Sequence, residues 1–92
     1  MSRIYIKRNH QLGQQKCQEL AEKITDKLIA QIGGSKTIRG NSIQYRHISG
    51  SKGELVSGED TLTVEVKLSL LARSFAPSIE AEINEACDKY LD

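Results

Sequence analysis

Hydrophobic and polar residues alternate along residues 61–68, and hydrophobic residues recur at helical spacing after residue 74. The first stretch places four apolar residues on one face, which is the pattern of a strand buried on one side: Leu62, Val64, Val66 and Leu68. The second stretch has apolar residues three and four positions apart: Phe75, Ile79, Ile83, Ala86 and Tyr90. Acidic residues lie opposite that stripe, so we expect an amphipathic helix that packs against the strand.

Periodicity also places five elements before residue 61. Alternation predicts strands over residues 3–8, 35–39, 42–48 and 54–57, and a helical period predicts a helix over residues 14–32. Gly33 and Gly34 end this helix, and Gly40-Asn41 suits a tight hairpin between the second and third strands. Because Pro77 is tolerated only in a first helical turn, the last helix should begin near residues 74–77.

The predicted element order is β-α-β-β-(β)-β-α, in which the strand over residues 54–57 is the optional one. One-sided strands and amphipathic helices must bury their apolar faces against each other, which favours two layers. We therefore expect an α+β fold with a mostly antiparallel sheet of four to five strands and two helices on one face. A chain of 92 residues has room for one shallow core, so residues 1–92 are interpreted as a single domain.

Composition is that of an ordinary globular chain, with 38% hydrophobic and 27% charged residues. The N-terminus lacks the apolar core of a secretory signal, and the chain has no transmembrane segment by pattern, so we expect a cytoplasmic protein. Cys17 and Cys87 lack Cys-x-x-Cys spacing. We expect both to be free thiols buried as small hydrophobic groups, with a disulfide between the helices as the less favoured alternative.

The net charge of +1 conceals an uneven distribution of charged residues. Residues 1–46 carry nine Lys or Arg against three acidic residues, whereas residues 47–92 carry four against nine. Either the two halves interleave in the fold and neutralise each other, or one charged face binds a polyanion. The first interpretation is favoured, because charge asymmetry alone says little about binding.

The sequence assembles no enzyme site. His10 and His47 lack the spacing of metal ligands, and no serine or cysteine lies in a nucleophile motif. The acidic residues of the last helix occupy its predicted solvent face. We therefore expect a protein that is not an enzyme, with no catalytic residue, no metal and no cofactor.

Two groups of residues near the N-terminus are candidates for binding. His10, Leu12 and Gly13 link the first strand to the first helix, where the favoured interpretation is a polar cap with a glycine turn and the alternative is a ligand site. Arg3, Tyr5 and Lys7 share the outer face of the first strand, with Arg46 expected on a neighbouring strand and Tyr45 expected in the core. Aromatic and basic residues on a sheet are typical of single-strand binding.

The junction between the last strand and the last helix is the third candidate. Leu70 and Leu71 are adjacent apolar residues that one helix face cannot bury together, and Phe75 follows them at the start of the helix. We expect a binding surface over Leu70, Leu71 and Phe75.

Four blocks of the chain match a known family in order and spacing. They are Ile4-x-Ile6-x-Arg8-x-His10-x-Leu12-Gly13, residues 39–45 (RGNSIQY), residues 50–55 (GSKGEL), and residues 64–71 (VEVKLSLL) followed by Ile79 and Ile83. In these blocks the chain resembles the polyhydroxyalkanoic acid system family, small bacterial proteins whose name implies association with polyester storage granules. It departs from the family's pattern at Ile38, Asn41 and Ser69, where tryptophan, aspartate and glycine are typical.

The resemblance implies a non-enzymatic accessory protein of polyhydroxyalkanoate metabolism that acts by binding, with the granule surface or granule proteins as partners. A second hypothesis is a carrier of small apolar ligands, with a cavity among Val64, Val66, Ile79 and Ile83. Single-stranded nucleic-acid binding is third, and nucleic acid is the least favoured partner. The sequence leaves the oligomeric state open, a homo-oligomer included.

Overall fold

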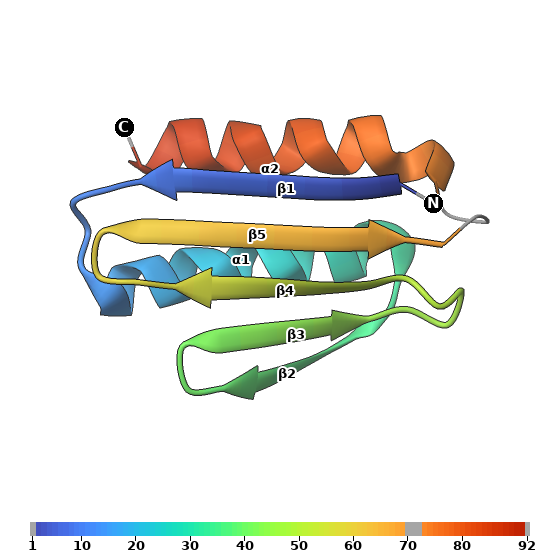
Figure 1. Cartoon of the computed structure of the whole chain (residues 1–92), viewed down its shortest axis with the longest axis horizontal. Helices are drawn as coiled ribbons and strands as arrows, with labels where there is room; N and C mark the ends of the chain where they lie inside the picture. The colour runs from blue at the N-terminus through green and yellow to red at the C-terminus, as the bar shows by residue number, and fades with distance from the viewer. Residues whose placement is uncertain (1, 70–72, 92) are drawn as a thin grey trace.

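Five antiparallel strands and two helices build the structure (Figure 1). The computed structural model describes residues 2–69 and 73–91. In spatial order the strands of the sheet run β1-β5-β4-β3-β2. The elements in chain order are β1 (Ser2–Asn9), α1 (Gln14–Ile32), β2 (Ser35–Arg39), β3 (Ser42–Arg46), β4 (Lys52–Ser57), β5 (Thr61–Leu68), a 3₁₀ turn η1 (Arg73–Phe75) and α2 (Ala76–Leu91).

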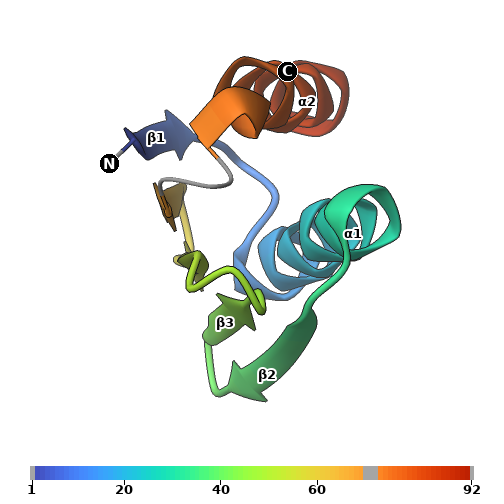
Figure 2. The same ribbon diagram turned by 90° about the vertical axis from the view of Figure 1, so that its right-hand side faces the viewer.

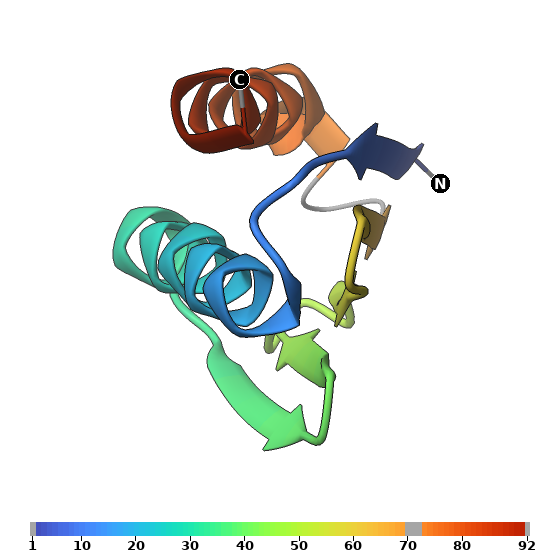
Figure 3. The same ribbon diagram turned by 90° about the vertical axis from the view of Figure 1, so that its left-hand side faces the viewer.

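Both helices cover the same face of the sheet, as the two end-on views show (Figures 2 and 3). Within residues 2–69 and 73–91, no element covers the opposite face, so one face of the sheet is buried and the other is open. The predicted α+β architecture is therefore confirmed in its element order, its antiparallel pairing and the side on which the helices lie. The optional strand of the prediction is present as β4.

The core lies between the inner face of the sheet and the two helices. The four alternating apolar residues of β5 are at most 1% exposed, and Ile79 and Ile83 of α2 are each 1% exposed. On the α1 side, Leu28 is 2% exposed, and Tyr45 of β3 is 1% exposed, as predicted. Each such side chain contributes roughly 2 kcal/mol of burial free energy, so β5 and the two helices stabilise one another.

The two ends of the predicted apolar stripe on the last helix are not buried. Phe75 is 44% exposed and Tyr90 is 39% exposed. Because α2 begins at Ala76, Phe75 lies in η1 and the helical period does not orient its side chain. Cys87 is fully buried beside Ala86, so the buried stripe of α2 includes these two residues but not Tyr90.

The β3–β4 connection differs from the predicted boundaries. β3 ends at Arg46, two residues earlier than predicted, and β4 begins at Lys52, two residues earlier than predicted. The backbone N–H of His47 donates to the carbonyl of Ser51 (2.9 Å), and that of Gly50 donates to the carbonyl of His47 (3.0 Å). These bonds close residues 47–51 into a tight loop.

Candidate functional site

The connection between β1 and α1 holds the predicted loop residues His10, Leu12 and Gly13. His10 is 6% exposed, and its Nδ1 accepts a hydrogen bond from the backbone N–H of Leu12 (3.1 Å). Gly13 has φ of +80°, a conformation that favours glycine, directly before α1 begins. The glycine turn is thus present, but the predicted cap is wrong, because no side chain caps the N-terminus of α1.

One polar atom of this loop is buried without a partner. Since Nδ1 of His10 accepts a hydrogen bond, its Nε2 carries the proton. That buried nitrogen has no hydrogen-bond partner among the described residues. Leu12 is half-buried and lines a shallow surface pocket of about 190 Å³ together with Leu20 and Tyr90. The three predicted loop residues therefore do not converge on one cavity.

Both cysteines are buried and neither forms a disulfide, as predicted. Burial raises the pKa of the Cys17 thiol, which keeps it protonated and poorly nucleophilic at neutral pH. Its sulfur lies 3.7 Å from the carbonyl oxygen of Thr61. Within residues 2–69 and 73–91, no group of three or more His, Cys, Asp and Glu side chains is arranged to hold a metal ion.

Arg3, Tyr5 and Lys7 all lie exposed on the open face of the sheet, as their alternation along β1 predicts. The Arg3 guanidinium pairs with the carboxylate of Glu65 on β5 and lies 5.8 Å from the centroid of the Tyr5 ring. The placement of Arg46 on a strand next to β1 is wrong, because β5 and β4 lie between β1 and β3. Arg46 nevertheless lies on the same face of the sheet.

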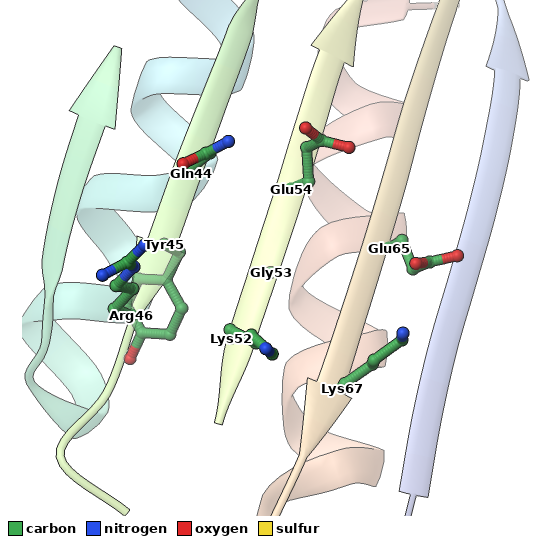
Figure 4. Close-up of a pocket in the computed structure, with 8 residues that line it drawn as sticks. All are labelled: Gln44, Tyr45, Arg46, Lys52, Gly53, Glu54, Glu65 and Lys67. Carbon is green, nitrogen blue, oxygen red and sulfur yellow. The ribbon is translucent and has the colours of Figure 1, made fainter. Parts of the chain in front are cut away.

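An open groove of about 240 Å³ lies on this face, across β3, β4 and β5 (Figure 4). Its charged and polar lining side chains are Gln44, Arg46, Lys52, Glu54, Glu65 and Lys67. The basic residues of the face come from both halves of the chain, so the division of charge by sequence halves does not describe the surface. Sequence reasoning missed Lys52 and Lys67 here, because strand register is not visible in the chain itself.

Leu70 and Leu71 of the predicted junction surface lie outside the described residues. Phe75, the third residue of that prediction, is exposed in η1. The junction begins at Ser69, whose backbone N–H donates to Ser51 Oγ (2.9 Å) in the β3–β4 loop. This bond ties the end of β5 to that loop.

The β3–β4 loop carries Ile48, an apolar side chain that is 99% exposed. In Figure 1 this loop and η1 lie at the same end of the domain. His47 anchors this loop to the end of α1, because its Nε2 lies 2.7 Å from the carbonyl oxygen of Ile32. Sequence reasoning missed Ile48 because residues 42–48 were interpreted as one strand. The available signal was an apolar residue directly before Ser49 and Gly50.

No helix in the described part of the chain is both long enough and apolar enough to cross a membrane. Among curated proteins, none matches the chain. A family model described as "Putative polyhydroxyalkanoic acid system protein" matches residues 4–91. The match runs from β1 through α2 and includes the His10 loop, the exposed β1 residues Tyr5 and Lys7, and the β5–α2 junction. This chain therefore belongs to the polyhydroxyalkanoic acid system family.

Proposed function

We propose that this protein is a non-enzymatic accessory protein of polyhydroxyalkanoate metabolism that acts by binding at the surface of polyester granules. Membership of the polyhydroxyalkanoic acid system family supports the metabolic setting. The observation that supports this binding mode is that Ile48 and Phe75 are exposed. They lie in two segments, the β3–β4 loop and η1, at one end of the domain. In the sequence, Leu70 and Leu71 fall between β5 and η1.

An exposed isoleucine in a loop has no partner within the described part of the fold. Moving such a side chain from water into an apolar surface contributes roughly 1.5–3 kcal/mol when it is fully covered. The loop that carries Ile48 is held at both sides, by Ser51 against Ser69 and by His47 against Ile32. Because the loop is already ordered, little conformational entropy is lost when it binds.

The packing of the core disfavours the alternative of an apolar-ligand carrier. The four residues expected to line a carrier cavity are at most 1% exposed and belong to one core cluster: Val64, Val66, Ile79 and Ile83. A pocket that reaches Ile83 between the two helices has a volume of about 10 Å³. That is room for about one water molecule and none for an acyl chain.

Co-sedimentation with particles of poly(3-hydroxybutyrate) tests the proposal, with polystyrene beads of equal surface area as the inert reference. We expect the protein to bind the polyester at least tenfold more tightly than the beads, and no soluble hydroxy acid to be released. The double variant I48S/F75S should lose most of this binding, and Leu71→Glu should weaken it as well. Ile38→Ser is the matched control, since Ile38 is 46% exposed on β2.

Three results would contradict the proposal. The first is equal binding of the wild-type protein to polyester and to polystyrene. The second is an equal loss of binding in Ile38→Ser and in the double variant, which would mean that general surface hydrophobicity holds the protein on the particles. Release of hydroxy acid would contradict the non-enzymatic role.

A further inference from the structure

We propose that the open face of the sheet binds single-stranded nucleic acid through a row of four cationic side chains. This inference uses a face of the molecule that the granule-binding proposal does not use. It rests on strand register, exposure and charge, and it is independent of the family assignment.

The row follows directly from the pairing of four adjacent strands. Arg46 of β3 lies opposite Lys52 of β4, and Lys52 lies opposite Lys67 of β5. Lys67 in turn lies opposite Arg3 of β1. All four side chains are exposed on the open face. With neighbouring strands about 4.8 Å apart, the cations extend over about 14 Å across the sheet.

Like charges directly opposite each other in a sheet are destabilising, so this row lowers the stability of the fold. Arg3 is paired with Glu65, but the described residues offer no ion pair to Arg46, Lys52 or Lys67. These three cations line the groove of about 240 Å³ on the same face (Figure 4). Cations that lack an ion pair attract a polyanion. A chain of phosphates along the row would relieve the repulsion that the fold leaves in place.

The neighbouring row identifies the kind of polyanion. Two positions along each strand, about 7 Å away, lie Tyr5, Glu65, Glu54 and Gln44, again directly opposite one another. Tyr5 is 56% exposed, so its ring is available to stack on a base. Carboxylate and amide oxygens accept hydrogen bonds from the amino groups of bases.

A chain of phosphates alone would be repelled by Glu54 and Glu65 in this second row. A nucleic acid strand places its phosphates on the cationic row and its bases on the second row. The phosphates then pair with the cations, and the bases donate hydrogen bonds to the carboxylates. Bases are free to lie on a sheet in this way only when they are unpaired. The two rows together therefore favour single-stranded nucleic acid over a naked polyanion such as polyphosphate.

Fluorescence anisotropy of a labelled mixed-sequence 12-nucleotide RNA, titrated with the purified protein at 50 mM salt, tests the row. The double variant K52A/K67A should bind at least tenfold more weakly. The slope of log K against log salt should fall in magnitude by about 1.4, since each phosphate contact to a single strand contributes about 0.7. The control K16A/K27A removes two exposed lysines of α1 and should bind like the wild type. No binding at 50 mM salt, or equal losses in the two variants, overturns the proposal.

A second comparison separates nucleic acid from other polyanions. Tyr5→Ala should weaken binding of the RNA at least fivefold and leave binding of inorganic polyphosphate of equal charge unchanged. Polyphosphate and the duplex of the same sequence should both bind more weakly than the single strand. If polyphosphate or duplex binds as tightly as the single strand, or if Tyr5→Ala binds the RNA like the wild type, the row is a general cationic surface and the proposal is wrong.

Discussion

The Nε2 atom of His47 lies 2.7 Å from the carbonyl oxygen of Ile32, the last residue of α1. Since a carbonyl only accepts, Nε2 donates and Nδ1 is left to accept the backbone N–H of Ser49 (3.1 Å). The carbonyls of the last helical turn lack partners within a helix, so this histidine satisfies one of them. One side chain thus joins the end of α1 to the loop between β3 and β4.

Replacing His47 should therefore loosen two elements at once. We expect His47→Ala to lower the free energy of unfolding by about 1–2 kcal/mol, because a helix-end carbonyl and a loop N–H both lose their partner. Urea denaturation followed by circular dichroism measures the change. His47→Gln keeps a side-chain donor and acceptor and should recover part of it. Wild-type stability in His47→Ala would mean that water replaces both bonds without cost.

The contrast between Ile83 and Phe75 tests where the core ends. Ile83 is 1% exposed, so Ile83→Asp would bury a carboxylate among apolar side chains and should unfold the domain. Phe75 is 44% exposed, and Phe75→Ala should cost less than about 1 kcal/mol. Far-UV circular dichroism and thermal melting measure both. A large loss of stability in Phe75→Ala would show that η1 packs into the core.

The fold follows from the sequence because its elements are strongly periodic. The alternation from Leu62 to Leu68 and the helical period over residues 14–32 both reflect one buried face, and burial is the largest stabilising effect available to a chain of this size. The predicted strand boundaries were wrong where local hydrogen bonds determine them. His47 lies outside β3 because its backbone N–H donates to Ser51 and closes a tight loop. A hydrophobic pattern does not predict such a bond.

The candidate sites depend on contacts between distant residues and were predictable only in part. Arg3, Tyr5 and Lys7 were placed correctly on one face, since alternation within β1 determines it. Lys67 and Lys52 join Arg3 only through the register of β1 with β5 and of β5 with β4. Register depends on the packing of whole strands against the helices. It cannot be predicted from the local sequence around each lysine.

Alkaline pH should destabilise the protein through Cys17 and Tyr45. Burial raises the pKa of the Cys17 thiol and of the Tyr45 phenol in the folded state. Above about pH 8.5, where an exposed thiol ionises, the unfolded chain therefore binds fewer protons than the folded one. The free energy of unfolding then falls as pH rises, by at most about 1.4 kcal/mol per pH unit for each group.

Thermal melting between pH 7 and pH 10 measures this dependence. Cys17→Ala should melt lower than the wild type at pH 7, because it loses buried volume, but its melting temperature should fall less steeply above pH 8.5. Ile24→Val removes a buried methyl group and no ionisable group, so it should keep the wild-type pH dependence. Parallel curves for Cys17→Ala and the wild type would rule out a contribution from the thiol.

Lys52 offers a test in which stability and binding change in opposite directions. It lies between Arg46 and Lys67 in the cationic row, so Lys52→Glu replaces two repulsive cross-strand pairs with two attractive ones. We expect the free energy of unfolding to rise by about 0.5–1 kcal/mol, from the size of such pairs in sheets. Lys7→Glu on the same face lies opposite Thr63 and should change stability less. Urea denaturation of both variants measures the difference, and RNA binding by the more stable Lys52→Glu should be weaker. A loss of stability in Lys52→Glu would mean that the row is not under electrostatic strain, and that its cations cost the fold nothing.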